Sequence, residues 1–256
     1  MGFDSTVFFV RGDVVAITTF VRKEKKYLIS EEQREKLLEI LPKYMVYDAY
    51  CQNGNKYTVN NVYFDTPTYN VIRYSLSKPT YKAKLRIRSY ITEAIDSSVV
   101  FLEMKKKYMG VVNKRRIVGN LKDIETFINT RTRPKVLTPQ QKQIFDEIEY
   151  VLDVEDVKPA VYLSYIRTAL FDRNDKDVRV TIDEDIIART TEVSLREKRY
   201  GTPLLPQGYY LMEIKVHGAF PLWLANILTE LNIHPTSYSK YGNFYLKKVK
   251  ERISNE

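Results

Sequence analysis

The chain has 256 residues, 44% of them hydrophobic, which is enough to bury a core and excludes wholesale disorder. Its 41 Lys and Arg residues outnumber 32 Asp and Glu residues, giving a net charge of +9. This excess favours an anionic partner, but it does not distinguish nucleic acid, a membrane surface and a small polyanion.

The number of cysteines and the length of the apolar runs indicate in which cellular compartment the protein is expected. A single cysteine, Cys51, excludes an internal disulfide framework and fits a reducing compartment. No stretch approaches the roughly 18 apolar residues that span a bilayer, and Arg11 and Asp13 interrupt the only early apolar run. We therefore expect a cytoplasmic protein with no transmembrane segment. Residues 1–16 match nothing downstream and are interpreted as an arm of unknown role, before a single domain over 17–256.

Alternating apolar and polar residues predict a β-rich chain with helices at the joins. The first strand is predicted over residues 17–29. A helix follows, because Ser30 and Gln33 form a capping box, and Pro42 marks its end. Further strands are predicted over residues 57–65, 81–90, 98–108 and 111–118.

The second half of the chain continues this pattern. Helices are predicted over residues 121–129 and from Thr138–Pro139, where an N-cap precedes a proline at the first helical position. Strands follow over residues 160–171, 177–186 and 208–218, and helices over 221–231 and from Ser239 onward. About eight strands without a linker or repeat indicate one α+β domain built around an antiparallel barrel.

Charged residues share one phase of the alternation, and apolar residues share the other. Since successive strand side chains point to opposite faces, Lys82, Lys84, Arg86 and Arg88 lie on one face of their strand. The same pattern recurs in Glu103, Lys105 and Lys107; Lys114 and Arg116; Arg179, Thr181 and Asp183; and Glu213, Lys215 and His217.

Two arrangements explain this pattern. A charged outer face exposed to solvent is the ordinary explanation for any one strand. Its repetition on five strands favours the second arrangement, in which apolar faces pack under helices and charged faces converge inside a barrel. Buried cations in that number are prohibitive without an anion or water, so this arrangement predicts a tunnel that binds a polyanion.

Nine segments occur in an order that resembles one known family. They are VRKEKKYLI, VYFDTP, KLRIRSY, FLEMKKK, NKRRI, YIRTAL, DVRVTID, LMEIKV and SYSKYGNF. Together they closely resemble the catalytic domain of the vacuolar transporter chaperone (VTC) family, within the triphosphate tunnel metalloenzyme superfamily. The resemblance implies an eight-stranded antiparallel β-barrel, the triphosphate tunnel, with flanking helices over residues 17–256. It also implies a polyphosphate polymerase that transfers the γ-phosphoryl group of ATP to a growing inorganic polyphosphate and releases ADP.

Matched motifs carry the family's site residues onto this chain. The expected catalytic cations are Lys26, the RxR pair Arg86 and Arg88, Lys105, Lys114, Arg167, Arg179 and Lys240. Glu213, in an LExK-like strand, is the expected ligand for Mn²⁺ or Mg²⁺, because hard cations prefer oxygen. Lys84, Arg116 and Lys215 share the charged phase and are expected to bind substrate. Glu24 and Glu103 remain open between a second metal ligand and an ion-pair partner.

Two departures from the family pattern bear on the activity. Arg22, Glu24 and Lys26 form RxExK, whereas the superfamily's hydrolases begin with ExExK, so the missing carboxylate favours a polymerase over a hydrolase. Ser237 stands where the family often has a second lysine. The sequence has no GxxxxGK[ST] phosphate loop, so side chains must bind the phosphates.

Three alternatives remain open at this stage. The same tunnel could hydrolyse tripolyphosphate or a nucleoside triphosphate. The chain could be a non-catalytic module that binds RNA, heparin or polyphosphate, although no RRM or KH signature is present and nucleic acid is not the expected partner. It could also be a catalytically silent relative. ATP and inorganic polyphosphate are the expected partners, and the sequence does not predict an oligomeric state.

Overall fold

The computed structural model describes residues 22–109 and 111–254. The predicted arm, residues 1–16, and the first five residues of the predicted first strand lie outside this range. The helix predicted after Ser30 is present as α1 (Glu31–Ile40), with the expected capping box formed by Ser30 and Gln33.

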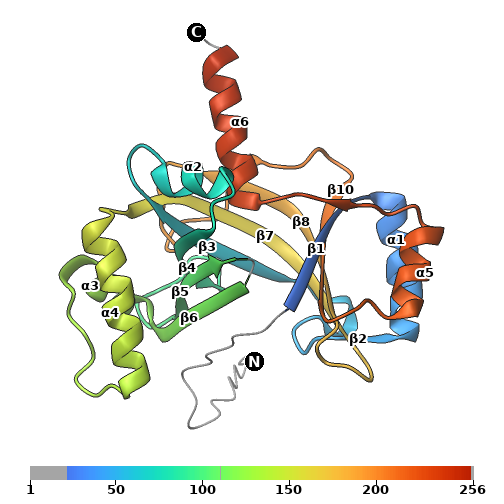
Figure 1. Cartoon of the computed structure of the whole chain (residues 1–256), viewed down its shortest axis with the longest axis horizontal. Coiled ribbons are helices and arrows are strands. Elements are labelled where there is room, and N and C mark those ends of the chain that lie inside the picture. The colour runs from blue at the N-terminus through green and yellow to red at the C-terminus, as the bar shows by residue number, and fades with distance from the viewer. Residues whose placement is uncertain (1–21, 110, 255–256) are drawn as a thin grey trace, which may run out of the picture.

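A single antiparallel sheet of eleven strands forms the centre of the described chain (Figure 1). Its eight long strands are β1 (Arg22–Ser30), β3 (Tyr57–Asp65), β4 (Tyr81–Ser89), β5 (Val99–Tyr108), β6 (Val111–Asn120), β7 (Lys158–Asp172), β8 (Arg179–Arg189) and β10 (Tyr209–His217). The other three, β2 (Met45–Tyr47), β9 (Thr202–Pro203) and β11 (Pro235–Thr236), have two or three residues each. The predicted strands are therefore confirmed, and the three short strands are additions to them.

The strand order is β11-β1-β10-β8-β7-β3-β4-β5-β6, with β2 beside β7 and β9 beside β8. The α+β class and the eight long strands are as expected, but within the described residues the sheet is not closed by pairing between β1 and β6. The outer edge of β1 is instead occupied by β11, through the pairs Lys26–Thr236 and Tyr27–Pro235. The predicted fold class is therefore confirmed, with the difference that the curved sheet is open rather than closed by strand pairing.

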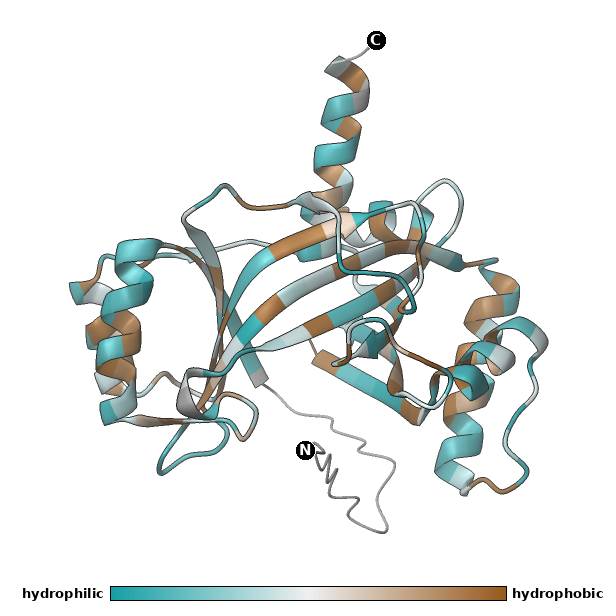
Figure 2. Ribbon diagram, turned by 180° about the vertical axis from the view of Figure 1, so that it is seen from behind, coloured by the Kyte–Doolittle hydropathy of each residue, from teal (hydrophilic) through white to brown (hydrophobic). Residues whose placement is uncertain are grey.

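Helices cover the outer face of the sheet in two groups, which lie on opposite sides in Figure 1. Helices α3 (Leu121–Thr130) and α4 (Pro139–Val154) bury Phe127 and Phe145 against Met104 of β5. Helix α1 and α5 (Leu222–Glu230) form a second apolar core with the outward residues of β1, β8 and β10. Figure 2 shows the alternation of hydrophobic and hydrophilic residues along these strands. Apolar side chains on the outer face leave the opposite phase for the interior.

Two further helices, α2 (Asn70–Leu76) and α6 (Lys240–Ser254), pack at one end of the interior. Tyr241 of α6 donates a 2.6 Å hydrogen bond to Asp65 at the end of β3. Asp65 also accepts hydrogen bonds from the backbone N–H groups of Val71 and Ile72, so it caps α2 from several residues upstream. Helix α2 was not predicted, because a cap this far from the helix leaves no local capping motif.

Candidate functional site

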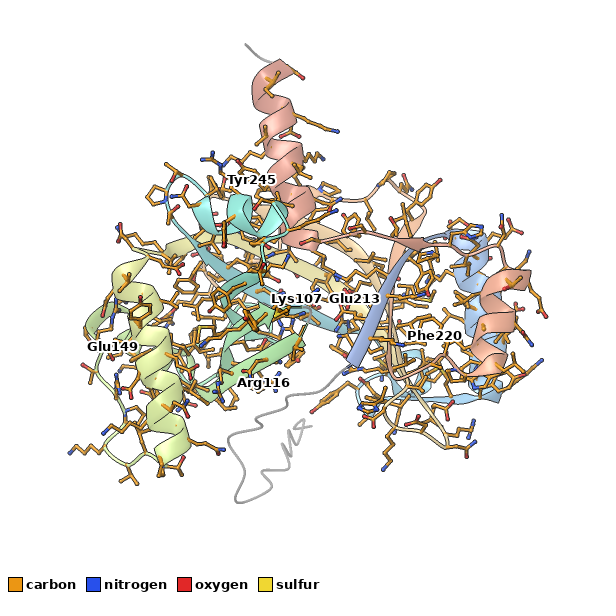
Figure 3. The ribbon with its side chains drawn as sticks, viewed as in Figure 1. Lys107, Arg116, Glu149, Glu213, Phe220 and Tyr245 are labelled. Carbon is orange, nitrogen blue, oxygen red and sulfur yellow. The ribbon has the colours of Figure 1, made fainter. Side chains whose placement is uncertain are left out.

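The charged phase of the strands faces the interior of the curved sheet, where it forms two groups of ion pairs and a set of cations between them. In Figure 3, Glu213 lies in the middle of the molecule and Arg116 on β6, whereas Glu149 and Phe220 lie at the helical periphery. The inward placement of charge is therefore confirmed, and the exposed outer face is rejected.

Glu103 on β5 is the centre of the first group, which we call the Glu103 cluster (Glu103, Arg86, Lys114 and Arg116). Arg86 donates two hydrogen bonds of 2.9 and 2.7 Å to Oε2, through Nε and Nη2. Arg116 donates through Nε at 2.8 Å to Oε1, and Lys114 Nζ lies 2.5 Å from the same oxygen. Burial alone would raise the pKa of Glu103, but the surrounding cations outweigh burial and hold that pKa well below its usual range.

The second group, the Glu213 cluster, contains Glu213, Asp183, Lys26, Arg167, Lys215 and Lys240. Nζ of Lys240, the first residue of α6, lies 2.6 Å from Asp183 Oδ2 and 2.9 Å from Glu213 Oε1. Arg167 on β7 donates two hydrogen bonds of 2.6 and 2.8 Å to Asp183. Lys26 and Lys215 each lie 3.8 Å from Glu213. Burial would raise the pKa values of Asp183 and Glu213, but these cations outweigh burial and lower both pKa values.

Tyr165 on β7 links Arg88 to the Glu213 cluster. Its hydroxyl group accepts a 3.4 Å hydrogen bond from Arg88 Nη2, and its ring lies under Lys240 Nζ at 4.5 Å and Arg167 Cζ at 5.0 Å. Arg88 also donates through Nε to the neutral Oδ1 of Asn61 at 3.0 Å. Arg88 is therefore held in place without a direct ion pair among the described residues, which leaves its charge available to a ligand.

Lys84 and Lys105 lie opposite β1 and β10 across the interior. Burial, followed by repulsion from Lys82, Lys105 and Lys26, lowers the pKa of Lys84 to about 8. The charge of Lys105 also contributes to lowering the pKa values of Glu24 on β1 and Lys215 on β10. Strands far apart in the sheet thus bring like charges together, a costly arrangement that an anion between them would relieve.

Arg179 on β8 marks one end of the cationic interior. Its Nη2 donates to Tyr57 Oη at 3.3 Å and lies 3.6 Å from Asp48 Oδ2. Its Nε is buried and, within the described part of the chain, has no hydrogen-bond partner, and the same holds for Oγ1 of Thr181 on the same strand. Buried polar atoms without partners indicate that water or a ligand completes the site.

The structure therefore places all eleven predicted cationic residues on the interior side, although in three different settings. The Glu103 cluster holds three, the Glu213 cluster holds four, and Lys84, Arg88, Lys105 and Arg179 lie outside both clusters. By contrast, Arg115 and Lys106, one residue out of phase, pair with Glu147 of α4 on the outer face. The side-chain phase, and not the local density of charge, decides which cations reach the interior.

Two carboxylates are positioned to hold a divalent cation. Oε2 of Glu24 and Oε2 of Glu213 both lie 3.8 Å from Lys215 Nζ, so the two carboxylates are close enough for a single small cation to contact both. Among the described residues, no cluster of three Asp, Glu, His or Cys side chains could form a complete metal cage. The pair fits Mg²⁺ or a similar hard cation that takes its remaining ligands from phosphate and water. Glu103, by contrast, is committed to three cations.

Sequence reasoning missed four interior residues that position these cations: Asp183 as an ion-pair partner, Tyr165, Asn61 and Tyr63. Tyr63 accepts a 3.0 Å hydrogen bond from Arg86 Nη1 and stacks on Tyr241 of α6 at 5.0 Å between ring centroids. The alternation rule could have found them, since Tyr165 lies two residues before Arg167, and Asn61 and Tyr63 share one phase of β3.

A separate hollow of about 480 Å³ lies on the outer phase of β8 and β10, where it is lined by Arg34, Glu184 and Tyr210.

This geometry can bind and align a chain of phosphates. Arginine forks and lysine ammonium groups approach one interior space from β1, β4, β5, β6, β7, β8, β10 and α6. Phosphoryl transfer requires positioning and neutralisation of charge on oxygen atoms, with little covalent participation by the protein. Preorganised cations in a partly buried interior supply both.

Comparisons with known proteins agree with this geometry. The family model described as the VTC domain matches residues 21–247. A putative adenylate cyclase from Bacillus halodurans is 14% identical, with a TM-score of 0.53, over 86% of this chain and 95% of that chain. The PH1819 protein of Pyrococcus horikoshii is 16% identical over 89% of this chain and 99% of that one, with a TM-score of 0.43. The first of these likenesses supports the fold. Among curated proteins none matches, and no described helix is long and apolar enough to cross a membrane.

Proposed function

The chain belongs to the VTC domain family, and from this membership we propose that it is a metal-dependent polyphosphate polymerase. It transfers the γ-phosphoryl group of ATP to the end of an inorganic polyphosphate chain and releases ADP. In this step the bond between the β,γ-bridging oxygen and the γ-phosphorus breaks. A bond forms between that phosphorus and a terminal oxygen of the polyphosphate.

The charge of the interior supports a phosphate chain as substrate. Eleven cations are met there by five carboxylates: Glu24, Asp48, Glu103, Asp183 and Glu213. An uncompensated excess of positive charge in a partly buried space is costly, and a polyanion removes that cost. The partnerless atoms of Arg179 and Thr181 can both donate hydrogen bonds, which is consistent with a ligand whose oxygen atoms accept them.

The charge environment of the interior carboxylates supports the choice of a transferase over a hydrolase. Glu24, Glu103, Asp183 and Glu213 all have lowered pKa values, because neighbouring cations outweigh the effect of burial. A carboxylate with a lowered pKa is a poor base for taking a proton from water. The terminal oxygen of a polyphosphate is already anionic near neutral pH and needs no base, so these residues suit a phosphate acceptor.

Each group of residues has a defined part in this proposal. Arg88, held by Asn61 and Tyr165, offers a planar fork to the transferred phosphoryl oxygens, and Lys84 and Lys105 neutralise the chain from the same wall. Lys26, Lys215 and Lys240 do so from the opposite wall, with Glu213 and Glu24 fixing their positions. A divalent cation held by these two carboxylates would supply further neutralisation of the triphosphate oxygens.

The proposal is tested by the products made from ATP with Mn²⁺ or Mg²⁺. We expect a polymer ladder on a gel and equivalent release of ADP. Free phosphate as the only product would replace the polymerase with a hydrolase, and phosphate-chain binding without turnover would indicate a non-catalytic module. Arg88→Ala should slow formation of the ladder on the order of 10²-fold, whereas its matched control Arg115→Ala, on the outer face beside Glu147, should leave it unchanged.

A further inference from the structure

A row of aromatic side chains borders the interior at the end opposite α6. Tyr50, Tyr57, Tyr90 and Phe101, which we call the aromatic arc, come from the loop after β2, from β3, from the residue after β4, and from β5. Successive rings meet edge to face, with centroids 5.9, 5.8 and 5.6 Å apart. Four separate elements thus contribute one continuous aromatic surface.

The arc begins where the row of interior cations ends. Tyr90 follows Arg88 by two residues and Phe101 precedes Glu103 by two, so each lies one step further along the same strand face, about 7 Å away. Arg116 Cζ lies 4.7 Å from the Phe101 ring centroid, and Tyr57 is paired in register with Arg167. The two surfaces are therefore continuous.

The opposite end of the interior, which we call the closed end, is filled by buried side chains of α6. Tyr241 and Phe244 of α6 are buried there against Val161 and Leu163 of β7. Asp65, which binds Tyr241, lies eight residues from Tyr57 on β3, so about 26 Å of strand separates this hydrogen bond from the arc. A group attached to a bound phosphate chain that leaves the interior along β3, at the end bordered by the arc, therefore passes the aromatic rings.

The arc is both held in place and accessible. Asp48 accepts hydrogen bonds from the backbone of Tyr50 at 3.0 Å and from Tyr57 Oη at 3.3 Å, and it lies beside Arg179. The turn after Tyr90 is fixed by Ser89, whose hydroxyl accepts from Ile91 N and donates to Ile91 O, both at 2.9 Å. Tyr50 is nevertheless 74% exposed and Tyr90 42% exposed. Aromatic rings that are positioned but uncovered can stack on a flat ligand.

We propose that the aromatic arc stacks on the base of the nucleoside triphosphate substrate, with Tyr90 and Tyr50 as the contacting rings. This inference rests on the proposed function only in assuming that a triphosphate occupies the cationic interior. A phosphate chain has no apolar face, so an inorganic chain gains nothing from these rings, whereas every nucleobase presents one. The arc thus distinguishes a nucleotide from tripolyphosphate, and because the contact is stacking, it favours purines by their larger area.

Calorimetric binding in EDTA separates this inference from the polymerase activity, because neither metal nor turnover is required. For Tyr90→Ala and Tyr50→Ala we expect ATP affinity to fall about 5- to 100-fold while tripolyphosphate affinity changes less than about twofold. Tyr90→Trp should retain ATP affinity. CTP should bind more weakly than ATP to the parent protein, and this difference should be absent in the two alanine variants. Tyr108→Ala removes an exposed tyrosine on the outer phase of β5 and serves as the control.

Equal losses for ATP and tripolyphosphate, or no loss for either, would overturn the base contact and leave the arc a part of the wall. Binding of tripolyphosphate without any binding of ATP would overturn it as well. A selective loss for ATP in a protein that makes no polymer would uphold the arc and reject the polymerase, so the two failures are distinguishable.

Discussion

Lys240 Nζ lies 2.6 Å from Asp183 Oδ2, and this contact joins the first residue of the last helix to the wall of the interior. Asp183 is fully buried and also binds Arg167 through both carboxylate oxygens. The pair therefore has two consequences: it fixes the position at which α6 enters the interior, and it keeps two substrate-facing cations in place when no anion is bound.

Removal of the Asp183 carboxylate should destabilise the protein more than any single substitution on its surface. Asp183→Ala leaves Lys240 and Arg167 with Glu213 as their remaining carboxylate, and breaking a buried ion pair typically costs about 3–5 kcal/mol. The free energy of unfolding in urea measures the loss. Tripolyphosphate should restore part of it, since an anion replaces the missing charge. A variant as stable as the parent, with or without tripolyphosphate, would show that the network contributes nothing to the fold.

Glu213 should be required for the response to divalent cations. Glu213→Gln preserves the shape of the side chain but removes the charge that Glu24 alone cannot replace. We expect Mn²⁺ to stabilise the parent protein against thermal unfolding and to have little effect on the variant. Glu213 also lies within 4 Å of Lys26, Arg167, Lys215 and Lys240, so some loss of stability is expected as well.

Lys84 should make the binding of polyanions depend on pH. Its pKa in the free protein is lowered to about 8 by burial and by nearby lysines, and a bound anion favours the ammonium form and raises that pKa. Affinity for tripolyphosphate should therefore fall as pH rises through about 8, and binding in that range should be accompanied by proton uptake. Calorimetry in buffers of different ionisation enthalpy measures the uptake.

Three other interior groups titrate in a similar range and must be separated from Lys84. Burial lowers the pKa of Lys215 to about 8 and that of Lys114 to about 7, and Tyr63 is the third group. Burial would raise the pKa of Tyr63, but Arg86, Arg88 and Lys84 lower it to about 8. The phenolate adds negative charge above that pH, so it weakens anion binding in the same direction. Lys84→Met and Tyr63→Phe should each remove part of the proton uptake, and Lys106→Met, on the outer face, should remove none. Unchanged uptake in both interior variants would contradict the assignment.

The sequence predicted the strands well because each depends on local alternation. Residues 57–65 were predicted and found as β3, and the capping residues Ser30 and Thr138 begin α1 and α4. Helix α2 escaped prediction because its cap, Asp65, belongs to the preceding strand. The open edge of the sheet depends on the two-residue strand β11, which has too few residues to show any period.

The candidate site was predictable in its members but not in their pairing. Side-chain phase assigned Arg86, Arg88 and Glu213 to the interior, because phase is a property of each strand alone. Which carboxylate binds which cation depends on the register between strands, and Arg86 meets Glu103 only because those residues are opposite each other in β4 and β5. The contribution of α6 through Lys240 depends on tertiary packing, which no local pattern records.

The two arginines of the RxR pair should differ in what their removal costs. Arg86 gives two hydrogen bonds to Glu103 and one to Tyr63, whereas Arg88 is held by the neutral groups of Asn61 and Tyr165. Arg88 therefore keeps more of its charge for the substrate. By analogy with other preorganised donors, Arg88→Ala should lower the rate of polymer synthesis on the order of 10²-fold and change ATP affinity much less.

The lysine variants decide whether the planar fork matters. Arg88→Lys should recover little of the lost rate, because an ammonium group cannot make two parallel hydrogen bonds to phosphoryl oxygens. Arg86→Lys should instead show its main cost in the free energy of unfolding, since Glu103 retains Lys114 and Arg116 but loses a bidentate partner. Polymer synthesis, ATP affinity and urea unfolding on both pairs of variants measure these differences. If Arg88→Lys is as fast as the parent, the interior cations act only through their charge, and the geometry of the fork is irrelevant to transfer.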